Sequence, residues 1–278
     1  MSTFLDQACA AARTRVAEAG QSVDLGALRE RAAASRPPAF AAALAAAGVT
    51  VIAEVKRASP SRGSIAEIPD AAALAGAYVE GGAGAVSVLT EPHWFRGSLE
   101  DLASISRSVA VPTLRKDFVV DPYQIWEARA AGAGAVLLIV AALDDALLAR
   151  LLATVDEVGQ DALVEVHDLD EARRAAAAFA AADTQRRPVI GVNARDLATL
   201  EVDPDRFAAV RDALPDAALA VAESGVRGPD DVRRLAGLGA DAVLVGEHVA
   251  LADDPAEAVR ALVEAGRSDA QTPTGVTP

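Results

Sequence analysis

The chain has only two lysines among its 26 basic residues, and both stand beside groups that can take part in acid–base chemistry. Lys56 lies two residues after Glu54 in Glu-Val-Lys-Arg-Ala-Ser-Pro, and Lys116 lies in Leu-Arg-Lys-Asp-Phe. Lysine differs from arginine because burial can lower its pKa enough for proton transfer. By composition alone, the two could equally be the remnant of a GC-rich genome that encodes arginine for most surface cations. Only their positions in the fold can distinguish active-site lysines from such remnants.

Further polar residues follow short aliphatic runs, where they could transfer a proton or orient a polar substrate. They are Glu165 and His167 in Leu-Val-Glu-Val-His, Asn193 and Arg195 in Gly-Val-Asn-Ala-Arg, and Glu223, Ser224 and Gly225 in Ala-Glu-Ser-Gly. We interpret His167 as structural, because the sequence offers it no partner motif. Glu54 has two interpretations, as a proton-transfer group or as half of an ion pair with Lys56.

Eight runs of β-branched and aliphatic residues must position these groups. They span residues 50–55, 85–89, 111–114, 135–140, 162–166, 189–192, 219–222 and 242–245. Alanine- and leucine-rich stretches with charges at helical spacing lie between them, and two of these, 122–131 and 229–237, begin with proline. Strands that alternate with helices in units of roughly 25 to 35 residues predict a single α/β domain, a (β/α)8 TIM barrel.

A weak internal repeat supports this alternation. Gly-Ala-Gly-Ala-Val begins at Gly82 and Gly132, and Gly-Ala-Asp-Ala-Val begins at Gly239, each time ending a helix and opening a strand. An open doubly wound sheet would place a phosphate-binding glycine turn after its first strand, and none follows Val55. The glycines at 81–84 precede a strand, which argues against a dinucleotide site.

The remaining segments flank the barrel. We expect residues 1–48 to form a helical extension that packs on the barrel and is interrupted at Pro37-Pro38. The barrel itself is expected over residues 49–267. Residues 268–278 are polar and rich in threonine and proline, and we expect this tail to be disordered.

The barrel decides between the two interpretations of the lysines. Catalytic groups of this fold lie at the carboxyl ends of the strands, and Lys56 and Lys116 follow the first and third predicted strands. Two remnant lysines would seldom both fall at such positions, so we predict that both are active-site residues. A period of two places Glu54 with Lys56, and Lys116 with Phe118, on the inward face.

The last two strands predict a phosphate site. Barrels commonly hold phosphate in the loops after strands seven and eight, where glycine permits close approach and a short helix presents its N-terminus. Ser224-Gly225 and Gly246-Glu247 occupy those two loops. Either glycine alone could serve a turn, but the two together favour a phosphorylated substrate.

Composition excludes several other classes of function. The net charge of -14 and the lack of a basic run argue against binding to nucleic acid or an anionic membrane. Cys9 is the only cysteine, so no intrachain disulfide can form, and we expect no metal site. Without a targeting or membrane-spanning pattern, the chain is expected to be cytoplasmic.

Several motifs together resemble one enzyme family. The segments are 54–63, 114–118, 122–129, 191–197 and 222–225. They are similar to indole-3-glycerol phosphate synthase, the fourth-step enzyme of tryptophan synthesis, and the likeness runs from about residue 4 to residue 266. The resemblance implies a lyase that cyclises 1-(2-carboxyphenylamino)-1-deoxyribulose 5-phosphate with loss of CO2 and water. It also implies that no cofactor is needed, and we expect a monomer or a weak homodimer.

By motif position, the resemblance also implies roles for individual residues. Lys116 would be the general acid that protonates the ribulose carbonyl, and Lys56 would hold the substrate carboxylate and phosphate. Glu165, assisted by Glu54, would handle protons during ring closure or loss of the hydroxyl. Which of Lys56, Glu54 and Glu165 drives dehydration stays open.

The other site residues implied by the resemblance bind or orient the substrate. They are Asn193 and Arg195, which also position Glu165, Phe118, which packs on the anthranilate ring, and Ser59, Glu223, Ser224, Gly225, Gly246 and Glu247. The pair Glu247-His248 departs from the family, which often has small hydroxyl residues there. Trp94 and Phe95 lie in a loop over the site, and we interpret them as loop packing rather than substrate contacts.

Three other functions compete with this one. A phosphoribosyl isomerase on the same barrel would use Cys and Asp, or two Asp, at strand ends, whereas Cys9 lies in the first helical segment. A Schiff-base aldolase would need a lysine on the sixth strand, which ends at Asn193. A barrel acting only as a scaffold would not require so many polar groups at one mouth.

Overall fold

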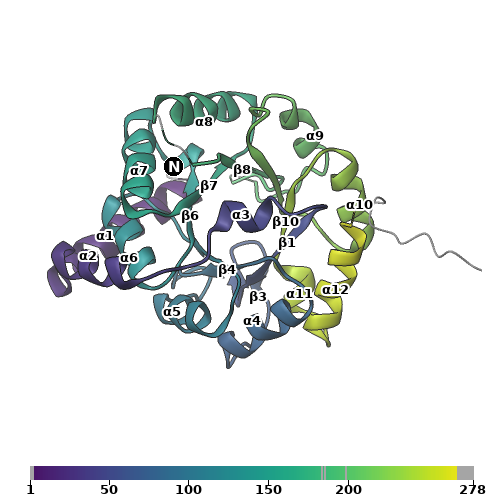
Figure 1. The fold of residues 1–278 in the computed structure, drawn as a ribbon, viewed down its shortest axis with the longest axis horizontal. Coiled ribbons are helices and arrows are strands. Elements are labelled where there is room, and N and C mark those ends of the chain that lie inside the picture. The colour runs from purple at the N-terminus through teal and green to yellow at the C-terminus, as the bar shows by residue number, and fades with distance from the viewer. Residues whose placement is uncertain (1–2, 183, 185, 198, 268–278) are drawn as a thin grey trace, which may run out of the picture.

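The protein is built on a closed barrel of eight parallel strands, in the order β1-β10-β9-β8-β7-β6-β5-β4 (Figure 1). The computed structural model describes residues 3–182, 184, 186–197 and 199–267. The barrel strands are β1 (Thr50–Val55), β4 (Ala85–Leu89), β5 (Thr113–Lys116), β6 (Ala135–Ile139), β7 (Asp161–Val166), β8 (Val189–Asn193), β9 (Leu219–Glu223) and β10 (Ala242–Val245). Because β1 pairs with both β4 and β10, the barrel closes, and the predicted TIM barrel is confirmed.

Helices form a ring outside the strands (Figure 1). They are α4 (Ala71–Glu80), α5 (Leu99–Ser108), α6 (Pro122–Ala130), α7 (Asp145–Val158), α8 (Leu169–Ala181), α9 (Arg206–Arg211), α10 (Pro229–Gly237), α11 (Glu247–Ala250) and α12 (Pro255–Ala265). A small hairpin, β2 (Ala58–Ser59) and β3 (Gly63–Ser64), follows β1, and a 3-10 turn, η1 (Val140–Ala142), follows β6. Among the described residues, no helix is both long and apolar enough to cross a membrane.

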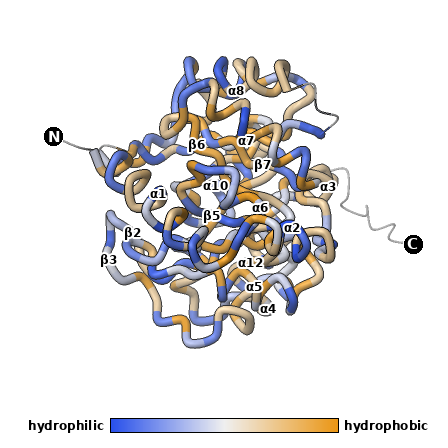
Figure 2. Tube along the Cα trace, turned by 90° about the vertical axis from the view of Figure 1, so that its left-hand side faces the viewer, coloured by the Kyte–Doolittle hydropathy of each residue, from blue (hydrophilic) through white to orange (hydrophobic). Residues whose placement is uncertain are grey.

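Alternating side chains divide the apolar core into two parts. Outward-facing strand residues such as Val51 and Val136 pack under the helix ring, and inward-facing residues such as Ile52, Leu137 and Leu163 fill the barrel. Figure 2 shows the apolar stretches running through the interior, with hydrophilic stretches around the periphery. Towards the carboxyl ends of the strands, the inward positions change from aliphatic to polar, which places polar groups at one mouth of the barrel.

The segment before β1 contains α1 (Phe4–Ser22), α2 (Leu25–Ala34) and α3 (Phe40–Leu44). Helix α3 crosses the end of the barrel opposite the polar mouth (Figure 1), where Phe40 and Leu44 are fully buried among inward-facing strand residues. The amide of Ala41 donates to the buried carboxylate of Asp161, which also pairs with Arg186 at 3.1 Å. These contacts stabilise the fold and lie away from the mouth.

Five of the eight barrel strands have bounds that differ from the sequence prediction, and three of them, β7, β8 and β9, are each longer by one residue at one end. The third barrel strand runs over Thr113–Lys116 rather than 111–114, so Lys116 is its last residue rather than a residue of the following loop. Pro112 has no N–H to donate to the ladder, which delays the start of the strand, although its carbonyl accepts from Val86. The fourth strand ends at Ile139, because Val140 begins the 3-10 turn.

Candidate active site

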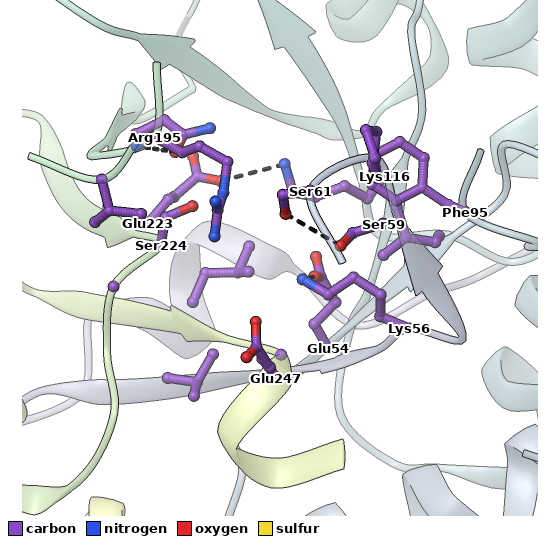
Figure 3. A pocket seen from close by; sticks show the side chains of 18 of the residues that line it. Glu54, Lys56, Ser59, Ser61, Phe95, Lys116, Arg195, Glu223, Ser224 and Glu247 are labelled. Atoms are coloured by element: carbon purple, nitrogen blue, oxygen red, sulfur yellow. Dashed lines mark hydrogen bonds and ion pairs between the residues drawn. The ribbon is translucent and has the colours of Figure 1, made fainter. Parts of the chain in front are cut away.

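A cavity of about 950 Å³ opens at the carboxyl ends of the strands (Figure 3). All thirteen residues that the sequence predicted for the site line it: Glu54, Lys56, Ser59, Lys116, Phe118, Glu165, Asn193, Arg195, Glu223, Ser224, Gly225, Gly246 and Glu247. They come from β1, β5, β7, β8, β9 and β10 and from the loops that follow these strands. Parallel strands that close into a barrel bring all their carboxyl ends to one mouth, whatever their separation in the sequence.

Lys116 lies between two buried carboxylates. Its Nζ is 3.1 Å from Oε2 of Glu165 and 3.3 Å from Oε2 of Glu223. Burial acts to lower the pKa of Lys116, but Glu165, Glu223 and Glu54 outweigh it, and the net result is a raised pKa. This differs from the expectation that burial would lower it, since three carboxylates stabilise the ammonium form. Lys116 is therefore protonated in this site and can act as a proton donor.

The two carboxylates that share Lys116 are shifted in opposite directions. Burial acts to raise the pKa of Glu165, but Lys116, His167 and a hydrogen bond from Asn193 lower it below its usual range. Burial raises the pKa of Glu223 to about 8, helped by the negative charges of Glu165 and Glu54. Neither oxygen of Glu223 has a hydrogen-bond donor among the described residues, since the Lys116 contact has ion-pair distance without hydrogen-bond geometry. One lysine thus keeps Glu165 ionised while Glu223 holds a proton.

This protonated Glu223 predicts a pH-dependent gain in stability for Glu223→Gln. A buried acid with a raised pKa contributes stability that is complete below its ordinary pKa and is lost as the pH rises through about 8. Glutamine resembles the protonated acid and cannot ionise. The variant should therefore match the wild-type Tm at pH 5 and exceed it increasingly from pH 6 to pH 8.5, as measured by calorimetry. If the Tm difference between Glu223→Gln and the wild type were the same at every pH, Glu223 would not titrate in this range.

Glu54 and Lys56 form a second pair at the end of β1 (Figure 3). Lys56 Nζ lies 2.8 Å from Glu54 Oε1, and Ser87, which sequence reasoning missed, donates to Glu54 Oε2 at 3.1 Å. Gly246 approaches this pair so closely that a Cβ there would lie 2.7 Å from Glu54 Oε1 and 2.9 Å from Lys56 Nζ. Likewise, a Cβ at Gly191 would collide with Glu223. Both glycines are required by side chains that cross the mouth.

The loops after β9 and β10 form a polar end of the cavity. Ser224 and Gly225 both have a left-handed backbone, with φ of 66° and 78°, a conformation that costs energy for serine and is typical of functional sites. Gly246 precedes the short helix α11, whose first residue is Glu247. Arg62, from the hairpin after β1, pairs with Glu247 at 2.7 Å across the cavity. Sequence reasoning missed Arg62, although a cation inside Ser-Pro-Ser-Arg-Gly was the available signal.

Asn193 is the last residue of β8, and Arg195 lies in the loop that follows it. The backbone N–H of Arg195 donates to Oδ1 of Asn193 at 2.9 Å, and Arg195 Nη1 donates to the carbonyl of Leu200 at 2.8 Å. An isolated bridge between Arg195 and Val202 closes this loop. The loop therefore orients a guanidinium at the edge of the cavity, as Figure 3 shows for Arg195.

Aromatic residues form an apolar side of the cavity. Phe4 from α1 packs edge to face with Trp94 at 5.3 Å and with Phe118 at 5.9 Å between ring centroids, and Phe95 lies 6.4 Å from Phe118. Phe4, Phe95 and Phe118 line the cavity, so Phe95 is more than the loop packing expected of it. Phe4 was missed. A planar apolar ring fits between such side chains.

A buried network holds this aromatic side in place. Glu91 is fully buried and accepts the backbone N–H groups of His93, Trp94 and Phe95, while Asp117 accepts that of Phe118. Arg15 of α1 reaches both carboxylates, at 3.3 Å from Glu91 and 2.7 Å from Asp117. One arginine thus connects α1 to the two loops that carry the cavity's aromatic rings.

Removing that arginine should loosen the aromatic side of the cavity. We expect Arg15→Met to lower the free energy of unfolding by about 1–3 kcal/mol, less than the 3–5 kcal/mol for a fully buried pair, because Arg15 is 27% exposed. KM for the substrate should rise several-fold, with kcat less affected. Arg173→Met, which removes an exposed ion pair with Asp170, is the matched control and should stay within about 0.5 kcal/mol. Equal urea midpoints for the two variants would contradict the prediction.

Solved structures of other proteins share this barrel. Thiamine phosphate pyrophosphorylase from Pyrococcus furiosus aligns with a TM-score of 0.56 and 16% identity, over 78% of this chain and 94% of that one. 3-Hexulose-6-phosphate synthase from Salmonella typhimurium aligns with a TM-score of 0.59 and 18% identity, over 78% of this chain and 98% of that one. At these identities the likeness establishes the fold alone.

Sequence comparison identifies the family. Residues 5–262 match the family model for indole-3-glycerol phosphate synthase. The protein of that name from Mycobacteroides abscessus is 53% identical over 265 residues, which cover 95% of each chain. Its counterpart from Mycobacterium tuberculosis is 52% identical over the same shares. With this likeness along nearly its whole length, and with the thirteen predicted site residues brought to one barrel mouth, the chain belongs to the indole-3-glycerol phosphate synthase family.

Proposed function

We propose that the barrel mouth converts 1-(2-carboxyphenylamino)-1-deoxyribulose 5-phosphate into indole-3-glycerol phosphate, CO2 and water. The chain is then a carbon–carbon lyase of tryptophan biosynthesis that works without a cofactor. The observation that carries this proposal is the ammonium of Lys116, held between Glu165 and Glu223 in a cavity with aromatic residues on one side and a glycine-lined polar end. Such a cavity matches a substrate with an anthranilate ring and a phosphate.

Lys116 serves as the general acid of ring closure. Its raised pKa leaves it protonated, so it can give a proton to the ribulose carbonyl oxygen as the ring carbon attacks and negative charge develops there. The attacking ring carbon, which bears the carboxyl group, then loses CO2, and the electron pair of the broken bond restores the aromaticity of the ring. The hydroxyl formed in the first step and a proton on the neighbouring carbon remain to be removed as water.

Glu165 is assigned to the removal of that last proton. It is 2% exposed, its pKa is lowered, and it lies 3.1 Å from Lys116, so it is an ionised base beside the acid. Glu54, beside Lys56 across the mouth, assists the departure of the hydroxyl. Glu223, with its raised pKa, acts as a neutral hydrogen-bonding group that orients the substrate.

The anionic groups of the substrate need local cations in a chain of net charge -14. At the polar end we assign the phosphate to Ser224, Gly225 and Gly246, with Ser59 and Glu247 at its edge. Lys56 supplies positive charge there. Asn193 and Arg195 orient the carboxylate, and Phe118 packs against the anthranilate ring.

The test is turnover by the purified protein. We expect release of CO2 together with the appearance of indole fluorescence, in a one-to-one ratio, when the substrate is added without metal or cofactor. A related phosphorylated ribulose that lacks the anthranilate ring serves as control and should give neither signal. No turnover under conditions in which another member of the family is active would refute the proposal.

Three further properties belong to the same proposal. The cavity lined by the thirteen site residues needs no second chain to complete it, and we propose a monomer or a weak homodimer as the working form. A small phosphorylated metabolite as substrate and a strongly acidic composition support a cytoplasmic protein without nucleic-acid or membrane partners. We propose that residues 1–48 form an extension and that residues 49–267 form the barrel. Residues 268–278, for which we expected disorder, lie outside the described residues. Sedimentation velocity tests the oligomeric state.

A further inference from the structure

His167 lies directly behind the carboxylate of Glu165. Its Nε2 is 3.4 Å from Oε1 of Glu165, the oxygen that Lys116 does not contact. Its Nδ1 is 3.0 Å from Oε2 of Glu171. The imidazole therefore stands between two carboxylates, one in the cavity and one outside it. The structure thus supplies the partners that no sequence motif revealed for His167.

Glu171 is held in place by the start of α8. Its backbone N–H donates to Asp168, the residue that caps this helix, and its Oε2 accepts the backbone N–H of His167 at 2.8 Å as well as the ring contact. Two contacts from one histidine to one carboxylate oxygen fix the ring relative to the helix. The ring is only 10% exposed, so water cannot easily replace either partner.

This geometry determines the charge of the ring. A neutral imidazole has one N–H and one bare nitrogen, and a bare nitrogen that faces an ionised carboxylate is repelled. Only the imidazolium form carries an N–H at Nε2 as well as at Nδ1. Nε2 makes no hydrogen bond among the described residues, but its positive charge lies within ion-pair distance of Glu165. Burial opposes that charge, but Glu171, Glu165 and Glu223 outweigh it, and the pKa of His167 is raised. Nearby on α8, Arg174 pairs with Asp145 and donates to the carbonyls of Val140 and Leu143 instead.

We propose that His167, held as an imidazolium by Glu171, is a positioning residue that keeps Glu165 ionised and fixes the direction of its carboxylate. Glu165 then lies between two cations, Lys116 at one oxygen and His167 at the other. The arrangement lets Lys116 give up its proton during the reaction while Glu165 still has a cation beside it. The inference rests on the proposed function, because it concerns the base that this function requires.

Kinetics test the effect on Glu165. The acid limb of the pH profile of kcat/KM reports the pKa of the base in the free enzyme. Removal of a neighbouring positive charge raises that pKa, so we expect His167→Gln to move the limb upward by about one pH unit and to lower kcat/KM by up to about tenfold at pH values on that limb. Glu171→Gln should move it in the same direction by a smaller amount. His93→Gln, at an exposed histidine outside the cavity lining, is the matched control and should leave the limb in place.

Nuclear magnetic resonance tests the charge without any need for turnover. With ¹⁵N-labelled histidine, the wild-type protein should show both ring nitrogens of His167 protonated at pH 7, where an ordinary histidine is mostly neutral. In Glu171→Gln the ring should lose its proton at a lower pH. A neutral His167 ring at pH 6.5 in wild-type protein overturns the inference even if His167→Gln fails to fold.

The two proposals fail in different ways. If the wild-type enzyme turns over and His167→Gln, folded by circular dichroism, keeps the wild-type acid limb, His167 is merely structural and the inference is wrong. If the wild-type protein does not turn over at all, the proposed function fails, and the resonance experiment still decides whether His167 is charged.

Discussion

Replacing Lys116 with arginine should reduce kcat by about three orders of magnitude, within the range for loss of a general acid. Arginine keeps the positive charge, but its guanidinium gives up a proton poorly. It is also larger and planar, so it cannot occupy the position of an ammonium that lies within 3.3 Å of both Glu165 and Glu223. Steady-state fluorescence of the indole product measures the loss.

Binding separates this chemical effect from damage to the site. Titration with indole-3-glycerol phosphate should give a Kd for Lys116→Arg within about tenfold of wild type, because a charge still compensates the two carboxylates. Lys116→Met, which leaves Glu165 and Glu223 buried without that cation, should lose stability as well as activity. A kcat for Lys116→Arg near that of wild type would remove Lys116 from the acid role.

Glu165→Gln should lower kcat by about 10²–10⁴-fold, whereas the same change at Glu223 should cost far less. The two carboxylates are equally buried and share one lysine, but their pKa values are shifted in opposite directions. Glutamine removes the negative charge of Glu165, which the base requires. At Glu223 it replaces an acid that already holds its proton, so Glu223→Gln is the matched control.

The comparison is best made from kcat and kcat/KM of both variants at pH 6.5, below the raised pKa of Glu223. Calorimetry at the same pH confirms that both proteins are folded. Equal losses for the two substitutions would mean that both carboxylates are ionised during turnover. The assignment of Glu165 as the ionised base and Glu223 as the neutral group would then be wrong. A larger loss at Glu223 would exchange their roles.

Much of this protein could be predicted before its structure was known, because the relevant signals are local. Eight aliphatic runs that alternate with helical stretches predict a barrel, and the end of each run marks a position at the mouth. Lys56 and Lys116 were placed in the site by this reasoning alone, and all thirteen expected residues line one cavity. Only boundaries moved, as at Pro112, where a missing N–H delays a strand.

The pairing of the charges could not be predicted in this way. Lys116 meets Glu165 across 49 residues of sequence, and Arg15 meets Asp117 across 102, through barrel closure and the packing of α1. The direction of each pKa shift depends on distances of a few ångströms between such groups. For that reason the sequence suggested a lowered pKa for Lys116, and the tertiary structure reversed it.

The two lysines illustrate which properties of the site follow from the sequence and which follow only from the tertiary structure. The sequence by itself determined that they belong to one barrel mouth, because the alternation of strands and helices and the period of two along each strand are properties of neighbouring residues. The pair of Lys56 with Glu54 was one of the two interpretations of the local pattern, whereas only the tertiary structure decided that Lys116 lies between Glu165 and Glu223. The partners of Lys116, and with them the directions of the pKa shifts at the mouth, depend on which strand ends meet when the barrel closes, and no local pattern records that.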